Sequence, residues 1–411
     1  MPYNNRQSFT LLELLIVIGI LGILGIIVVL VLNPAALFSQ ARDANRISEI
    51  LSINKAIKIY QTLGGTTGGV SDTVYISIPS NSATCVGLNL PTLPAGWSYQ
   101  CQTQDNFRKM NGTGWIPINF TTISAGSPFA TLPIDPINDA TKNLYYAYID
   151  GGGVVPSYEI LATLESEKYL QDSSSKDGGT DPTKYEEGTN LILWAEASGL
   201  LGYWPFDGNA QDSSGNGYHG SIIDVGPPSP TFITGQINQG LNLPGIFSRV
   251  DAGQSLPILG LTKATASFWI KFNTLPSIAG NPFALMGRWT GNDASRVFGI
   301  FIRDPNTTAM ATDNPTQKIS YLAIPTLQTG QWYHFAYTYN AGNGNFYIDG
   351  ENIGAFSGLD ASLRISAPSS SFTIGADSEP YGPSNATFDD ARFYNRLMTD
   401  QEIQSIYLSG K

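Results

Sequence analysis

The longest apolar run of the chain lies close to its start. From Leu14 to Leu32 the sequence has 19 consecutive residues without a polar side chain. As a helix, this run is about 28 Å long, which matches the hydrocarbon thickness of a bilayer. It is too long for the apolar core of a secretory signal peptide, and no small-residue cleavage site follows it. The pattern therefore predicts a membrane-anchoring helix.

A second helix is predicted directly after the first. Pro34 lacks a backbone donor and should break the helix where the apolar run ends. Apolar residues then recur every three or four positions between residues 47 and 60, which is typical of a helix with one buried face. Asp43 and Arg46 have the spacing of an ion pair on that helix. The pair Gly64–Gly65 is a typical helix end.

The rest of the chain reads as short strands separated by turns. Residues 63–195 are expected to form a globular head of α+β type, with a Ser-, Gly- and Asp-rich loop over residues 171–190 and a last strand at residues 191–194. Residues 199–411 alternate aromatic and β-branched positions without helical periodicity, which predicts an all-β jelly-roll sandwich. The Asp349–Gly350 pair within this part marks a hairpin turn.

Composition narrows the class of protein. The chain has 43 glycines, only 13% charged residues and a net charge of −11, which suits a β-rich exported protein and argues against nucleic-acid binding. The two cysteines, Cys85 and Cys101, both follow the apolar run. If this region is exported, we expect one disulfide between them; the alternative is two buried thiols.

One charge interrupts the apolar N-terminus. Glu13 lies at the start of the run, where a carboxylate in a bilayer costs about 2.5–3.5 kcal/mol unless it has a partner. The stretch from Arg6 to Ile18, with Phe9 and Glu13, resembles the leader junction of type IV prepilins and pseudopilins. The resemblance implies cleavage by a prepilin peptidase between Ser8 and Phe9, followed by N-terminal methylation. Ser8 departs from the glycine that is usual in that family.

The same resemblance gives Glu13 a role in assembly. In the family this carboxylate pairs with the free amine of a neighbouring subunit. The sequence is thus divided into a leader (residues 1–8), a membrane and assembly helix (9–62), a pilin head (63–195) and the sandwich (199–411).

Three motifs make the sandwich resemble a laminin G-like, concanavalin A-like domain. They are the segments 203–217, 331–336 and 388–396. Many such domains hold calcium where the first and last strands meet, so the resemblance implies that Asp207 and Asp389 bind calcium. The alternative is that Asp207 belongs to a turn and that Asp389 makes strand-end hydrogen bonds.

The sequence favours a binding protein over an enzyme. The chain has only two histidines, His219 and His334, and residues 199–411 lack the closely spaced carboxylates of laminarinase-type glycosidases. We expect a single-pass protein of the cytoplasmic membrane that joins other pilin subunits in a surface filament and displays the sandwich for adhesion to a glycan or another ligand. A secretion-system pseudopilin and a filament decoration without a ligand are the alternatives.

Overall fold

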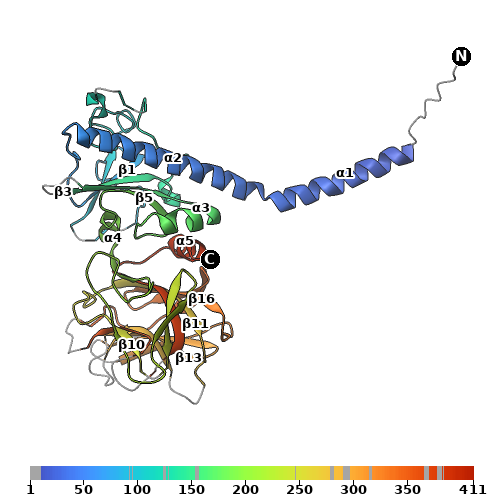
Figure 1. Ribbon diagram of the computed structural model, residues 1–411, viewed down its shortest axis with the longest axis vertical. Helices are drawn as coiled ribbons and strands as arrows, with labels where there is room; N and C mark the ends of the chain where they lie inside the picture. The colour runs from blue at the N-terminus through green and yellow to red at the C-terminus, as the bar shows by residue number, and fades with distance from the viewer. Residues whose placement is uncertain are drawn as a thin grey trace.

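In the computed structural model, two consecutive helices lead into two globular domains that lie against each other (Figure 1). The structure describes residues 11–411 except 92, 95, 124–125, 128, 153–156, 246, 278–281, 290–296, 314–316, 365–369, 377–381 and 383. In α1, the side chains are described only as far as residue 21.

The N-terminal helices meet at a bend. Helix α1 comprises Leu11–Leu32 and helix α2 comprises Pro34–Thr62. Between them, Asn33 has a φ of 37°, and its side chain caps α2 by accepting a hydrogen bond from the Ala36 amide. Pro34 fits the first helical position because its missing N–H would have no partner there. The predicted helix break at Pro34 is confirmed (Figure 1).

The described helices were also compared with the requirements of a membrane span. Within the part of the chain that the structure describes, no helix is both long and apolar enough to cross a bilayer.

The head is a helix packed on a five-stranded sheet. Apolar residues of α2, including Ile50, Ile53 and Ile57, are fully buried against one face of the sheet, which explains the spacing seen in the sequence. The opposite face packs against Trp194 of α4. The sheet order is β2-β1-β3-β4-β5. The elements are β1 (Thr73–Pro79), β2 (Ser98–Gln102), η1 (Phe120–Thr122), η2 (Ala140–Lys142), β3 (Tyr146–Gly152), β4 (Ser157–Thr163), α3 (Glu167–Asp172), η3 (Ser174–Lys176), β5 (Lys184–Gly188) and α4 (Leu193–Ser198).

Two expectations for the end of the head are wrong. The segment 171–190 is not only a loop, because β5 is an edge strand of the sheet. Residues 191–194 are not a strand, because helix α4 begins at Leu193. The sequence of β5 was misleading because a buried carboxylate, Glu186, stands where an apolar residue is usual; its Oε2 accepts a hydrogen bond from the Asp181 backbone N–H within the head.

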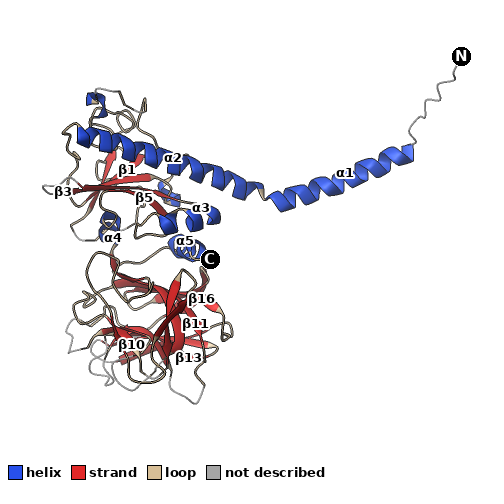
Figure 2. Cartoon of the chain, viewed as in Figure 1, coloured by secondary structure: helices blue, strands red, loops and turns tan. Residues whose placement is uncertain are grey.

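The second domain is a sandwich of two antiparallel sheets (Figure 2). The larger sheet has the order β18-β17-β16-β11-β20-β9-β8, with β6 paired to β20, and the other has the order β15-β14-β13-β12-β19-β10-β7. Its strands are β6 (Leu200–Trp204), β7 (Ser221–Ile223), β8 (Thr231–Thr234), β9 (Gln239–Pro244), β10 (Arg249–Asp251), β11 (Lys263–Phe272), β12 (Phe283–Arg288), β13 (Phe298–Asp304), β14 (Thr307–Asp313), β15 (Gln317–Ala323), β16 (Trp332–Asn340), β17 (Gly344–Ile348), β18 (Glu351–Phe356), β19 (Phe372–Ile374) and β20 (Asn385–Tyr394).

Alternation along the strands fills the core between the sheets. Phe268 and Ile270 of β11 point inward, whereas the intervening Trp269 points to the outer face. The predicted hairpin is also confirmed: Asp349 and Gly350 connect β17 to β18, with φ of 52° and 79°. These angles belong to the left-handed region that a two-residue turn of this kind requires.

The chain ends in helix α5, Asp400–Ser409, which lies between the sandwich and the head (Figure 1). A capping box of Thr399 and Glu402 starts this helix. Helix α5 departs from the all-β structure expected for residues 199–411.

Candidate functional site

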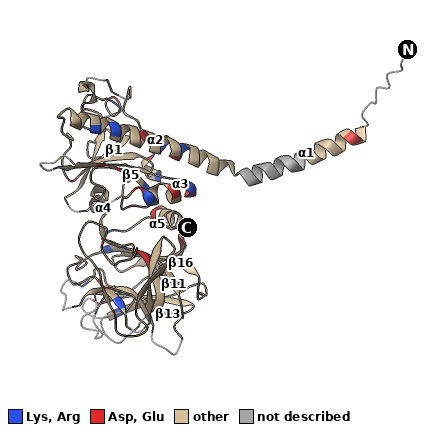
Figure 3. Ribbon diagram, in the orientation of Figure 1, with Lys and Arg blue, Asp and Glu red and all other residues tan. Residues whose placement is uncertain are grey.

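The processing and assembly residues lie at the start of α1. Ser8 and Phe9 are outside the described residues, so the structure does not test the cleavage position. Glu13 lies in the first turn of α1 and is the acidic residue of that helix (Figure 3).

A buried cluster of four charged residues fastens α2 to the head. Arg46 donates to Asp135 through Nε (2.6 Å) and Nη2 (3.0 Å), and its Nη1 donates to Asp43 (2.7 Å) and to Glu165 (2.5 Å). The side chains of Arg46, Asp43 and Asp135 are fully buried. Burial alone would lower the pKa of Arg46, but the bonds and charges of its partners outweigh it and raise the pKa above the ordinary value.

Asp43 completes this Arg46 cluster. Its carboxylate accepts hydrogen bonds from the backbone N–H groups of Glu165 (3.1 Å) and Ser166 (2.7 Å), which lie just before α3. The predicted Asp43–Arg46 pair is confirmed, and the structure extends it to residues about 90 and 120 positions away in the sequence. The cluster therefore sets the direction in which the N-terminal end of α2 leaves the head.

The two cysteines form the expected disulfide. Cys85, in the loop between β1 and β2, is bonded to Cys101 of β2, and both are buried. The bond closes a loop of 16 residues, so it restricts the unfolded chain and stabilises this irregular part of the head.

The two aspartates proposed as calcium ligands bind one turn of the protein itself. Asp389 Oδ2 accepts hydrogen bonds from the backbone N–H groups of Gln236 and Ile237, both at 2.8 Å. Asp207 Oδ1 accepts from the N–H of Gln239 at 2.9 Å. Both carboxylates thus hold the turn between β8 and β9, and a Cβ at Gly235 would lie only 2.5 Å from Asp389 Oδ2.

These residues do not fit a calcium ion. Hydrogen-bond donors, rather than lone pairs, point at the carboxylates, and the described residues include no group of three or more acidic, histidine or cysteine side chains arranged for a metal. Burial, followed by the charges of Asp390 and Asp207, raises the pKa of Asp389 to about 8, so its carboxyl is largely protonated at neutral pH. A protonated carboxyl is a poor calcium ligand.

The head and the sandwich share a buried interface built around Arg396. Arg396 Nε donates to the carbonyl oxygen of Ser198 at 2.6 Å, and its Nη1 and Nη2 donate to Glu402 at 3.0 and 2.7 Å. Burial alone would raise the pKa of Glu402, but Arg396 outweighs it and lowers that pKa. One arginine therefore ties the end of β20 both to the end of α4 and to α5.

Helix α5 contributes to the packing on both sides of this interface. Ile403 and Ile406 are buried against the sandwich, and Leu408 packs against the core of the head. Gln401 Nε2 donates to the carbonyl of Lys142 in the head at 3.1 Å. With polar and apolar contacts on both sides, α5 holds the two domains in one orientation.

The part of the larger sheet beneath α5 is closed to ligands. Trp269 and His334 are 3% and 1% exposed on this outer face, and the Tyr407 ring of α5 lies 5.7 Å from Trp269. His334 Nε2 is hydrogen-bonded to Ser267 Oγ at 2.9 Å. Burial, followed by the charge of Arg392, lowers the pKa of His334 to about 3, so the ring is not protonated at neutral pH.

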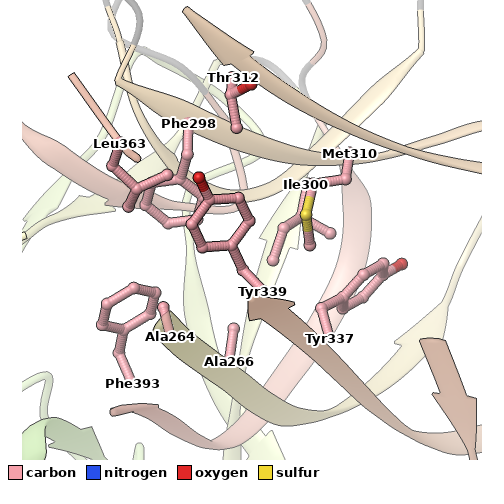
Figure 4. Close-up of a pocket in the computed structure, with 10 residues that line it drawn as sticks. All are labelled: Ala264, Ala266, Phe298, Ile300, Met310, Thr312, Tyr337, Tyr339, Leu363 and Phe393. Atoms are coloured by element: carbon pink, nitrogen blue, oxygen red, sulfur yellow. The ribbon is translucent and has the colours of Figure 1, made fainter. Parts of the chain in front are cut away.

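The cavity inside the sandwich is too small for a ligand. It lies between the two sheets, lined by side chains that include Ala264, Ala266 and Met310 (Figure 4). Its volume is about 10 Å³, which is at the lower limit for a single water molecule. The hydroxyl groups of Tyr337 and Tyr339 on its wall are already bonded to other protein groups.

Two parts of the chain match known protein families. Residues 3–29 match the prokaryotic N-terminal methylation motif, and residues 247–404 match the concanavalin A-like lectin/glucanases superfamily. This chain combines a prepilin-type, pilin-like N-terminus with a concanavalin A-like laminin G domain. The methylation motif implies processing by a prepilin peptidase at the cytoplasmic membrane and assembly with other pilins.

Solved structures resemble the pilin-like protein at low identity. Domain 4 of AbnA, a GH43 extracellular arabinanase from Geobacillus stearothermophilus in complex with arabinotriose, is 19% identical over 50% of this chain and 97% of its own, with a TM-score of 0.37. The binding domain of botulinum neurotoxin serotype G is 16% identical over 51% of this chain and 50% of its own, with a TM-score of 0.39. The serotype D ligand binding domain in complex with N-acetylneuraminic acid gives the same identity, coverage and TM-score. No curated protein sequence matches this chain.

Sequence reasoning missed the residues that hold the parts of the pilin-like protein together. Asp135 reads as an ordinary Asp-Pro turn, Arg396 only as the end of the laminin G-like segment 388–396, and Glu402 was not singled out. The sequence does contain a pattern that involves Glu402. Thr399 and Glu402 have the spacing of a capping box, which predicts the start of a helix. Nothing in the sequence connects that helix to Ser198 in the head.

Proposed function

We propose that this protein is a subunit of a type IV filament that carries a lectin domain for binding surface glycans. Before assembly, the apolar segment of α1 anchors the subunit in the cytoplasmic membrane, and after cleavage before Phe9 the subunit joins a filament outside it. The domain is proposed to act by binding rather than by catalysis, because residues 199–411 lack the closely spaced carboxylates that laminarinase-type glycosidases use.

The fixed contact between lectin domain and head carries this proposal. An adhesin at the end of a flexible linker would point in any direction, whereas α5 and Arg396 hold this domain beside the head. In Figure 1 the domain lies on the side of the head opposite to α2, away from the helices through which subunits of a filament would pack. The arrangement is that of a module displayed on the outside of an assembly.

Glu13 offers the most direct test of assembly. Its carboxylate lies in the first turn of α1, at the start of the apolar segment and within the matched methylation motif. If this carboxylate pairs with the N-terminal amine of a neighbouring subunit, Glu13→Ala should leave leader cleavage intact and abolish most incorporation into filaments. Sheared filaments and membranes from the native host are compared by immunoblotting.

Glu49→Ala is the matched control. This residue is also an acidic side chain on the N-terminal helices, but it accepts a hydrogen bond from Tyr146 of the head at 2.6 Å and therefore acts within the subunit. Normal filament levels for Glu13→Ala, together with normal cleavage, would contradict the proposed role.

A further inference from the structure

On the outer face of the larger sheet, helix α5 leaves one end of strands β11 and β16 uncovered. Helix α5 covers Trp269 and His334, but two residues further along the same strands Lys271 and Trp332 are half-buried. Lys271 and Trp332 are paired in register, and the Lys271 Nζ lies 4.8 Å from the centroid of the Trp332 ring. The Trp332 ring is therefore partly exposed at this end of the sheet, with the Lys271 ammonium over it.

Three asparagines from three adjacent strands lie at the same end. Asn242 is in β9, Asn385 begins β20, and Asn273 directly follows β11; these strands neighbour one another in the sheet. The core-facing residues Leu241, Ala386 and Phe272 are next to them in the sequence, so all three asparagines are on the outer face. We call them the asparagine cluster.

The hydrogen bonds of the asparagine cluster fix the amide orientations. Asn273 Nδ2 donates to Asn242 Oδ1 at 2.8 Å and to Asn385 Oδ1 at 3.0 Å. Both hydrogens of the Asn273 amide are thereby used, which leaves its Oδ1 as an acceptor. The Nδ2 groups of Asn242 and Asn385 donate to no acceptor among the described residues, so the cluster offers two donors and one acceptor.

Such a cluster is costly as a purely structural feature. Asparagine is depleted from β-strands, yet these three asparagines lie in or directly after three neighbouring strands, where they do not fill the core. Local departures of this kind are expected at functional sites. The donors are also uncharged, in a chain whose net charge is −11, so they are suited to a ligand that is recognised by hydroxyl groups.

We propose that the asparagine cluster and Trp332 form the carbohydrate-binding site of the lectin domain, for a sugar with vicinal hydroxyl groups. Each hydroxyl both donates and accepts, which matches the alternating amide groups, and the apolar face of the ring packs on the indole. This inference rests on the proposed function, which it deepens by placing the ligand. Since the face is open, binding by one subunit is weak, and the many copies in a filament raise the avidity.

The test uses the full chain in detergent micelles, multimerised on fluorescent beads and applied to an array of neutral and acidic oligosaccharides. Asn273→Ala and Trp332→Ala are each expected to weaken binding about tenfold, as the loss of hydrogen bonds or of an aromatic contact would. Asn273 is exposed, so its replacement leaves the fold intact, and melting curves of both variants check this. Tyr321→Ala is the matched control, because Tyr321 is 51% exposed on β15 of the other sheet.

The possible results distinguish an error in the proposed site from an error in the proposed glycan binding. Loss of binding in both variants, with wild-type binding by Tyr321→Ala, supports the site. Wild-type binding by folded Asn273→Ala and Trp332→Ala would overturn the site while leaving glycan binding by the domain in place. If the unaltered chain binds no oligosaccharide on the array, both the site and the glycan-binding part of the proposed function are wrong.

Discussion

Arg46→Met is expected to lower the free energy of unfolding of the head by about 3–5 kcal/mol, because it leaves buried carboxylates without their cation. Asp43 and Asp135 are fully buried and each is bonded to the Arg46 guanidinium. Their remaining partners are backbone and hydroxyl donors, which do not replace a full positive charge. Methionine keeps much of the side-chain volume, so the change isolates the electrostatic loss. Thermal melting of the full chain in detergent should show a fall of roughly 10 °C.

Arg42→Met is the matched control for this measurement. Arg42 is one turn earlier on α2 and pairs with the same Glu165, but its side chain is 31% exposed. Solvent screens such a pair, and its loss should cost less than about 1 kcal/mol. Equal effects of the two substitutions would show that burial of the Arg46 cluster is not what holds α2 on the head.

Arg396→Ala is expected to release α5 and the lectin domain from the head. The substitution removes the bond to Ser198 and leaves Glu402, whose side chain is 11% exposed, without its ion-pair partner. Loss of one partner of a buried pair costs about 3 kcal/mol or more, and that cost falls on the interface. In hydrogen-exchange mass spectrometry, amides of Asp400–Ser409 should therefore lose protection about a hundredfold.

Arg364→Ala serves as the control for the interface. Arg364 pairs with Asp313 at 3.5 Å within the lectin domain, on the β14 side of the sandwich. Its replacement should leave exchange in α5 unchanged. Unaltered α5 protection in Arg396→Ala would mean that apolar packing alone joins the two domains.

The sequence was most informative where local patterns decide structure. The bend at Pro34, the Asp349–Gly350 hairpin and the strand alternation around Phe268 all follow from backbone geometry and burial within a few residues. The prepilin motif is equally local, because one contiguous stretch around Phe9 and Glu13 carries it.

Contacts between distant segments were not predictable in this way. Strand β5 was missed because its buried Glu186 depends on the folded loop: the backbone N–H of Asp181 donates to Glu186 Oε2, and Asp177 Oδ2 accepts from the backbone N–H of Glu186. Asp389 suggested a metal ligand because its sequence neighbourhood does not reveal the turn at Gln236, 153 residues away, that donates to it. Arg396 pairs with Ser198 across a separation of 198 residues.

Mass spectrometry of filaments sheared from the native host tests the central claim most directly. The claim is that one polypeptide is both a processed pilin subunit and the carrier of the lectin domain. It predicts that the filament fraction contains a chain that begins at Phe9, carries one N-terminal methyl group and extends through the sandwich to Lys411. A filament fraction without peptides from residues 199–411, or a mature chain that retains residues 1–8, would contradict it.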